Sequence, residues 1–300
     1  MEPITLDDLR LPQRANYHWD HLGIDHPMLI DTPQHCLDLD HWHSYPHPIT
    51  YCFNSRGFRD LEWPTDLRSA VWCVGDSFTL GIGQPWAHTW PQVFEHYTAQ
   101  RTVNISMDGA SNDWISRRGG QIISAVAPRL MIVQWSYLHR RELASTSETQ
   151  RRLWQAFYQD FRDASWPQHV EFDQFDQLPS AIQQEIQNDP YWVNIATPDD
   201  HDRRLDHPDR EEILSESADL DNLLANIQRL DRQQSTQIIH TFIPRISPNA
   251  EQFQKWLESN MGSRLWIPEI QQQDRARDGH HYDIITAQSL VESVLELLHK

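Results

Sequence analysis

The sequence predicts an α/β fold in which parallel strands alternate with helices. Between residues 69 and 135, short apolar runs such as AVWCVG, TVNIS and RLMIVQW alternate with longer amphipathic stretches. This alternation is typical of a parallel sheet whose strands are joined by helical crossovers. The 300 residues are 39% hydrophobic and include 13 Trp and 10 Phe, which suffices for one large core.

The first three strands of this sheet are expected at 70–75, 102–106 and 129–135. The stretches between them have the helical spacing of apolar residues, and they predict helices at about 88–99 and 112–126. Each strand is too short and too apolar for a surface position. We therefore expect them to be buried on both faces of the sheet.

A long polar stretch interrupts this order at about 143–235. Within it, helices are predicted at 147–163 and 217–233, separated by charged and turn-rich sequence that we interpret as a surface insertion or lid. The sheet resumes with a strand at 236–244, and RLWIP at 264–268 is expected to be its fifth strand. TAQSLVESVLELLHK then predicts a closing amphipathic helix.

Residues 1–66 show little periodicity and predict an irregular extension packed on the main domain, which spans 67–300. This extension contains a dense histidine group around HWHSYPH. Two histidines at i and i+2 can share a metal on a strand, but no cysteine or firm fourth ligand lies nearby. Aromatic packing is the better interpretation, and no metal is expected. The histidines are His35, His41, His43 and His47.

The charge of the chain excludes several classes of partner. A formal net charge of −18 argues against binding to nucleic acid or to an anionic membrane surface. No leader-like segment or apolar run of membrane-spanning length is present, so we expect a cytoplasmic protein. Three cysteines without a CxxC pair favour a reducing compartment, with Cys73 as a small buried thiol in the first strand.

The loop GDSFTLGIG follows the first strand and presents a serine at the edge of the sheet. Loops at the carboxyl ends of parallel strands converge on one crevice, where ligands bind. Gly75 would permit a sharp turn, and Ser77 would begin the next helix. The N–H group of Ser77 has no acceptor within that helix, so it can donate to a developing oxyanion.

Two later loops supply groups that could act with this serine. Gly109, in NISMDGASND after the second strand, lets the backbone approach a ligand and offers a second N–H. Asp278 precedes His281 by three residues in DRARDGHHYD. That spacing lets the carboxylate and the imidazole point in the same direction, so that the carboxylate can fix the tautomer of the imidazole.

Together, GDSFTLGIG, VNISMDGAS and DGHH resemble the SGNH hydrolase family, also called GDSL esterases, over about 67–300. FNSRGFRD at 53–60 is similar to a subgroup with an amino-terminal extension. The resemblance implies a flavodoxin-like three-layer α/β/α sandwich with about five parallel strands, and no cofactor. It also implies Ser77 as nucleophile, His281 as general base and Asp278 as its orienting acid. The oxyanion hole would be formed by Ser77 and Gly109.

The chain departs from the family at the third block. After its third strand the family usually carries Gly-x-Asn-Asp, whereas this chain has WSYLHRRE. One oxyanion donor is therefore missing from its expected place. Asn112 could lean into the crevice as a substitute, or it could serve only as the N-cap of the following helix. Tyr137 and His139 are further candidate donors.

Neighbouring residues compete for some of these roles. His280 could replace His281 as the base, and Asp274 or Asp283 could replace Asp278, although the spacing favours the first assignment. GDSFTLGIG lacks the third glycine and the later acid of a dinucleotide-binding loop.

Two charged features near the site have simpler interpretations. Asp76 is expected to be a structural acid that binds loop amides. In HRRE, Arg140 or Arg141 could face a substrate anion, but pairing with Glu142 on the surface is the default interpretation.

These residues favour a serine-dependent hydrolase that cleaves an ester, with an O-acyl group on a carbohydrate as the expected substrate. Two alternatives stay open: an O-acyltransferase that uses the same site, and a non-catalytic carbohydrate-binding or particle-structural protein on an SGNH scaffold. We expect a small-molecule or carbohydrate ester as the partner, and neither nucleic acid nor membrane. Assembly into an oligomer or particle, including a virion for a phage-encoded protein, is left open.

Overall fold

The computed structural model describes residues 49–143, 215–232, 235–244 and 249–299, together with short pieces at 5–6, 9–11, 15–16, 18–21, 193–194 and 246. The predicted helix at 147–163 and most of the 143–235 insertion lie outside the described residues. The same is true of Cys36, His35, His41, His43 and His47.

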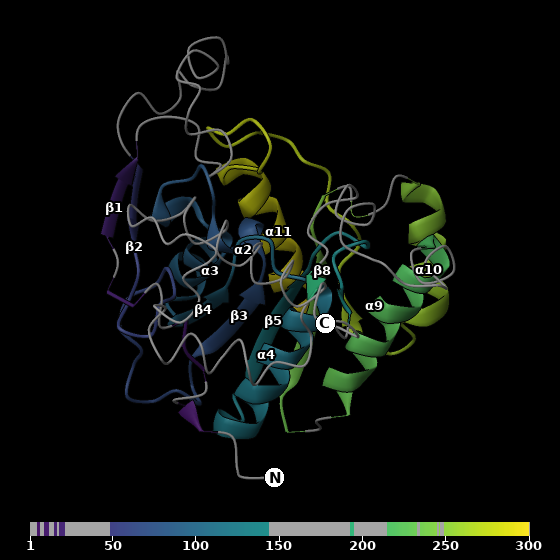
Figure 1. The fold of residues 1–300 in the computed structure, drawn as a ribbon, viewed down its shortest axis with the longest axis horizontal. Helices are drawn as coiled ribbons and strands as arrows, with labels where there is room; N and C mark the ends of the chain where they lie inside the picture. Colours follow the sequence, from purple (N-terminus) through teal and green to yellow (C-terminus); the bar gives the residue numbers. More distant parts are fainter. Residues whose placement is uncertain are drawn as a thin grey trace, which may run out of the picture.

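A five-stranded parallel sheet forms the centre of the molecule (Figure 1), in the order β4-β3-β5-β8-β9. The chain leaves the first strand in one direction, returns to its other side and continues outward, which is the flavodoxin-like order. The expected α/β fold with five parallel strands is confirmed. The strands are β3 (Val71–Gly75), β4 (Thr102–Ser106), β5 (Leu130–Trp135), β8 (Gln237–Phe242) and β9 (Leu265–Trp266).

Helices cover both faces of this sheet. The connections β3–β4 and β4–β5 run in opposite directions, so right-handed crossovers put α3 and α4 on opposite faces. Figure 1 shows α9 beside α4 and α11 beside α3, which completes three layers. The long helices are α3 (Trp90–Thr98), α4 (Asn112–Val126), α9 (Glu216–Asp231), α10 (Ala250–Asn260) and α11 (Ile284–Leu298).

The core fills the space between these layers. Every residue of β3, β4 and β5 is buried, as expected for strands that are covered on both faces. Cys73 in β3 is fully buried, which confirms its interpretation as a core thiol.

The amino-terminal segment contains a short antiparallel pair, β1 (His18–His21) with β2 (Ile49–Cys52), which the sequence analysis did not predict. Each of these strands has only four residues, which is too short for a strand pattern to be recognised in the sequence. Leu9, Leu11 and Phe58 from this segment are buried in the main core. A further antiparallel pair joins β6 (Glu142–Leu143) to β7 (Val193–Asn194).

The described ranges contain neither a membrane-spanning helix nor a cluster of metal ligands. None of these helices combines the length and the apolar character needed to cross a lipid bilayer. Among the same residues, no group of three or more His, Cys, Asp or Glu side chains is arranged to hold a metal ion.

Candidate active site

The serine of GDSFTLGIG begins a one-turn helix directly after β3. Asp76 is the N-cap of α2 (Ser77–Leu80), and its Oδ1 accepts a hydrogen bond from the Phe78 N–H at 3.0 Å. Ser77 therefore occupies the first helical position, where its own N–H has no partner within the helix. Gly75 is needed for space, because a Cβ there would lie 2.0 Å from Thr79 Oγ1.

The structure brings Ser77, His281 and Asp278 together across about 200 residues of sequence. His281 Nε2 lies 2.8 Å from Ser77 Oγ, and His281 Nδ1 is hydrogen-bonded to Asp278 Oδ2. Asp278 Oδ1 also accepts the backbone N–H groups of His280 and His281, each at 3.0 Å. Ser77 is 1% exposed and His281 3%, so this row of groups is shielded from bulk water.

The electrostatics of the row favour an imidazole that gains a proton easily. Burial lowers the pKa of His281. Attraction to the Asp278 carboxylate and the hydrogen bond between the two side chains raise this pKa by more than burial lowers it, so the net shift is upward. Burial raises the pKa of Asp278, while His281 and the backbone N–H groups lower it more, to about 2. Asp278 therefore stays ionised and holds the proton of neutral His281 on Nδ1, which leaves Nε2 to accept from the serine.

The competing residues have other partners. His280 is exposed, and its Nε2 lies 3.1 Å from the Tyr137 hydroxyl. Asp274 accepts from the Thr286 hydroxyl and from the Asp283 N–H. Asp283 caps α11, accepting from the Ile284 N–H at 2.8 Å. The hydroxyl of Ser77 is met instead by His281 Nε2.

Asp76 joins the serine helix to the loop after β5. Its Oδ2 accepts from the Ser136 hydroxyl and from Arg140 Nη1, the latter at 2.9 Å, and the side chain is fully buried. The expectation of a structural acid at this position is confirmed.

The predicted pairing of Arg140 or Arg141 with Glu142 is wrong. Arg140 binds Asp76, and Arg141 Nη1 lies 3.1 Å from Asp219 Oδ1 on α9, where both side chains are less than a tenth exposed. Glu142 pairs with Arg117 instead. Consecutive residues of an extended loop point in different directions. Arg140 and Arg141 therefore pair with acids on different elements.

Asn112 does not point to the serine. Its Nδ2 donates to the carbonyls of Tyr137 at 3.1 Å and Ser136 at 3.4 Å, and its Oδ1 accepts from the Ser136 N–H at 2.9 Å. Both amide hydrogens are engaged in holding the loop after β5, which corrects the prediction of a substitute oxyanion donor. Its alternative role as N-cap is also wrong, because Ser111 caps α4 by accepting from the Trp114 N–H.

The remaining candidate donors lie in the neighbouring loops. Gly109 follows β4 with a φ of 68°, a conformation that favours glycine. The Tyr137 hydroxyl lies within hydrogen-bond distance of His280 Nε2, and the Tyr137 ring stacks on the ring of His139 with centroids 5.6 Å apart.

A buried polar network beneath the serine was not identified from the sequence. Gln134 on β5 accepts from Thr79 Oγ1 at 2.9 Å and from Trp90 Nε1 at 3.1 Å, and its Nε2 donates to the Tyr282 hydroxyl at 2.9 Å. This network ties the serine helix, β5, α3 and the histidine loop together. The available signal was a glutamine inside the apolar run LMIVQW, because buried amides are nearly always hydrogen-bonded.

Comparisons with known proteins found only distant likeness. No protein-family model and no curated protein matches the sequence. Among solved structures, TesA is similar over 76% of this chain and 97% of its own, with 13% identity and a TM-score of 0.41. A protein from Desulfitobacterium hafniense DCB-2, assigned to the G-D-S-L lipolytic family, is similar over 76% and 99%, with 11% identity and a TM-score of 0.39.

A protein from Bacteroides fragilis NCTC 9343, assigned as an acylhydrolase, is similar over 80% of this chain and 91% of its own, with 9% identity and a TM-score of 0.37. All three overlaps are too loose to carry a function from one protein to another. The assignment of a reaction therefore depends on the distances among Ser77, His281 and Asp278.

Proposed function

We propose that this protein is a serine-dependent hydrolase that cleaves an ester. The observation that carries the proposal is the contact of 2.8 Å between Ser77 Oγ and His281 Nε2, with Asp278 bound to the opposite ring nitrogen. A hydroxyl, an imidazole and a carboxylate in this order are what nucleophilic acyl transfer requires.

The reaction proceeds in two balanced halves. Ser77 Oγ attacks the carbonyl carbon of the ester while its proton passes to His281 Nε2. The bond from carbon to the alcohol oxygen then breaks, and His281 delivers that proton to the leaving alkoxide. Water attacks the acyl-serine in the same way and releases the acid, so water is the one co-reactant.

The negative charge on the carbonyl oxygen must be met by donors near Ser77. The Ser77 N–H at the first position of α2 is one, and we assign the Gly109 N–H as the second. Asn112 has no part in this hole, because it holds the loop after β5.

For the substrate we propose a neutral acyl ester, with an O-acyl group on a carbohydrate as the leading class. The net charge of −18 and the acids around His281 disfavour an anionic ester. A second candidate, transfer of the acyl group to a sugar hydroxyl, is favoured by the burial of Ser77 and His281, which limits the access of water.

The test is labelling by a fluorophosphonate probe and hydrolysis of p-nitrophenyl acetate. We expect the wild-type protein to react in both assays and Ser77→Ala to lose both, because the nucleophile is absent. Ser259→Ala, which removes an exposed hydroxyl on α10, is the matched control and should behave as wild type. Full labelling of Ser77→Ala would exclude the assignment, and no reaction by wild type would favour a non-catalytic binding protein. Product analysis with and without an acceptor sugar separates hydrolysis from transfer.

A further inference from the structure

The turn at 80–84 links the two halves of the candidate site. α2 is a single helical turn that ends at Leu80, and Gly81 follows with a φ of 79°. The Gly83 carbonyl accepts from the Arg277 N–H at 3.1 Å, and Gln84 Nε2 donates to the Tyr282 carbonyl. The turn therefore connects the serine helix to the loop that holds His281.

Arg59 binds several carbonyls of this turn at once. Its Nη1 donates to the carbonyls of Leu80 at 3.1 Å and Gly81 at 2.5 Å, and its Nη2 donates to that of Gln84 at 2.8 Å and that of Thr50 at 3.2 Å. The side chain is fully buried. The Leu80 and Gly81 carbonyls lie at the end of α2, where a helix leaves its last carbonyls without helical partners and where a cation is favoured.

Tyr51 supports the same arrangement from the strand next to Arg59. The guanidinium carbon of Arg59 lies 4.1 Å from the centre of the Tyr51 ring, and the Tyr51 hydroxyl accepts from the Gly83 N–H at 2.9 Å. The amino-terminal segment thus contacts the turn through two side chains, Arg59 and Tyr51.

We propose that Arg59 is a positioning residue that fixes Ser77 relative to His281. The inference rests on the proposed function for its consequence in catalysis. A planar guanidinium can bridge three carbonyls of a turn in fixed directions, whereas an ammonium is a compact point charge on a flexible four-carbon stem. Arg59→Lys therefore keeps the charge but loses the bridge.

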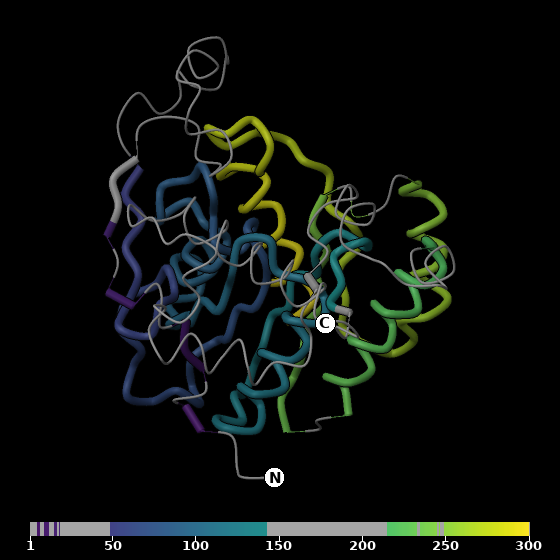
Figure 2. Tube along the Cα trace, viewed as in Figure 1, coloured from purple at the N-terminus to yellow at the C-terminus, as the bar shows by residue number. Residues whose placement is uncertain are grey.

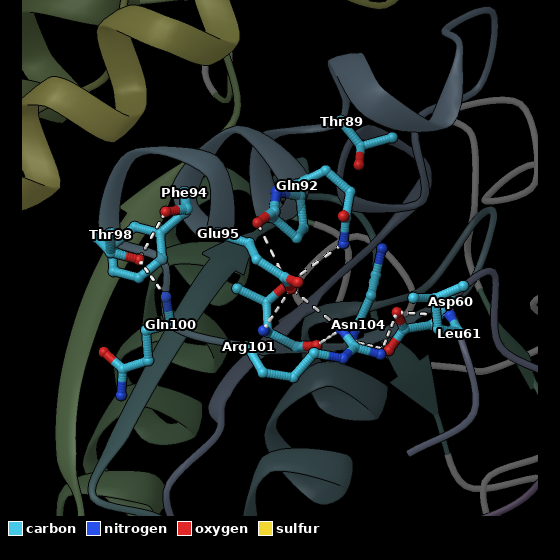
Figure 3. Close-up of polar contacts among 12 residues, drawn as sticks. Asp60, Leu61, Thr89, Gln92, Phe94, Glu95, Thr98, Gln100, Arg101 and Asn104 are labelled. Atoms are coloured by element: carbon cyan, nitrogen blue, oxygen red, sulfur yellow. Dashed lines mark hydrogen bonds and ion pairs between the residues drawn. The ribbon is translucent and has the colours of Figure 1, made fainter. Parts of the chain in front are cut away.

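The same segment has a second anchor that does not touch the turn, and this anchor supplies a control. Asp60 Oδ2 accepts from the N–H of Asn104, in the middle of the edge strand β4, at 3.1 Å, and its Oδ1 pairs with Arg101 Nη2 at 2.9 Å (Figure 3). Arg101 also pairs with Glu95 on α3. Arg101→Gln weakens the attachment of the segment and leaves the contacts of Arg59 in place.

The experiment compares wild type, Arg59→Lys and Arg101→Gln in ester hydrolysis and in fluorophosphonate labelling. We expect Arg59→Lys to lower kcat and the labelling rate at least tenfold while KM changes less than threefold, since the geometry of attack is lost and substrate binding is not. Arg101→Gln should stay within twofold of wild type in both rates, even where its urea midpoint falls as far as that of Arg59→Lys. Equal rates for the two variants would overturn the inference.

Hydrogen exchange gives a readout that needs no activity. The Gly83 and Arg277 amides should exchange at least tenfold faster in Arg59→Lys than in wild type, and at the wild-type rate in Arg101→Gln. Unchanged exchange in Arg59→Lys overturns the positioning role, whereas an inactive wild type overturns only the proposed reaction. Should Arg59→Lys fail to fold, Tyr51→Phe removes one bond to the turn, and it must speed exchange of the Arg277 amide, whose acceptor is the Gly83 carbonyl, for the inference to stand.

Discussion

His281 has partners of opposite kind on its two ring nitrogens. The carboxylate of Asp278 accepts on one side, and the hydroxyl of Ser77 lies within hydrogen-bond distance on the other. Phe78 stands beside the imidazole, with ring centroids 4.4 Å apart, and keeps the ring in this plane of contacts. An imidazole held in this way presents Nε2 to the hydroxyl of the serine.

The rate of ester hydrolysis should rise with pH through the pKa of His281, because only the neutral ring can accept the serine proton. Asp278 raises that pKa above its ordinary value of about 6.5, so the inflection of kcat/KM should lie above 6.5. Asp278→Asn should move the inflection to lower pH and reduce the rate by roughly 10²–10⁴. The measurement is kcat/KM from pH 5 to pH 9.

His280→Gln is the control for this profile. His280 is exposed, and the charges that raise the pKa of His281 are carboxylates, so the loss of His280 should leave the inflection where it was. An Asp278→Asn profile that overlays the wild-type profile would contradict the role of Asp278.

Some residues of the site could be found in the sequence and others could not. Ser77, Asp278 and His281 stand out because each lies in a short loop next to a recognisable strand or helix. The direction of Asn112 depends on carbonyls of a loop 24 residues later, which no local pattern reveals. Arg59 lies in FNSRGFRD, but its partners are backbone carbonyls, and these have no signature in the sequence.

The predicted ends of the sheet strands and of the crossover helices differ from the observed ends by no more than two residues. Burial on both faces makes each strand a continuous apolar run, and long helices such as α4 carry a full apolar face. α10 was missed, because only Phe253 and Leu257 of its eleven residues are buried. An element that contributes so little to the core leaves a weak pattern.

Gly83 is required for the approach of the turn at 80–84 to the histidine loop. It has a φ of 74°, and an added Cβ would lie 3.0 Å from the Asp278 nitrogen and 3.0 Å from the Ala276 Cβ. We expect Gly83→Ala to lower the free energy of unfolding by about 1 kcal/mol through its backbone conformation. It should also lower kcat at least tenfold, because the loop that carries His281 must move away.

Gly262→Ala separates these two effects. Gly262 follows α10 with a φ of 58°, and an added Cβ there meets nothing within 4 Å. It should show the same loss of stability by urea unfolding and retain kcat within twofold. A Gly83→Ala protein with wild-type kcat would show that the turn does not set the position of His281.

At the scale of the whole molecule, the site is assembled from three distant parts of the chain. Figure 2 shows the yellow carboxyl-terminal segment returning to the blue region that contains β3 and α2. Arg59 attaches the amino-terminal segment to the turn at 80–84, which follows α2. Arg141, in the loop after β5, forms an ion pair with Asp219 on α9. Since these ties use buried charges, the stability of the fold is linked to pH.

Two buried acids set the direction of that link. Burial raises the pKa of Asp60 to about 6 against the opposing pull of Arg101, and burial raises the pKa of Asp219 to about 7 against Arg141. A carboxyl whose pKa is higher in the folded state binds its proton more tightly there. Its contribution to the free energy of unfolding is therefore complete below about pH 4, and it is lost as the pH rises through the pKa of the carboxyl in the folded state.

We accordingly expect the free energy of unfolding to fall between pH 4.5 and pH 7.5, with Asp60 contributing of the order of 2 kcal/mol to the fall. Asp60→Asn and Asp219→Asn cannot ionise, so each should flatten this slope in urea unfolding, whatever its effect on stability at one pH. Asp66→Asn is the control, because hydrogen bonds from Ser69 lower the pKa of that exposed carboxyl and its loss should leave the slope unchanged. A slope as steep in Asp60→Asn as in wild type would mean that Asp60 remains ionised in the folded protein across this range, held by Arg101 at the edge of β4.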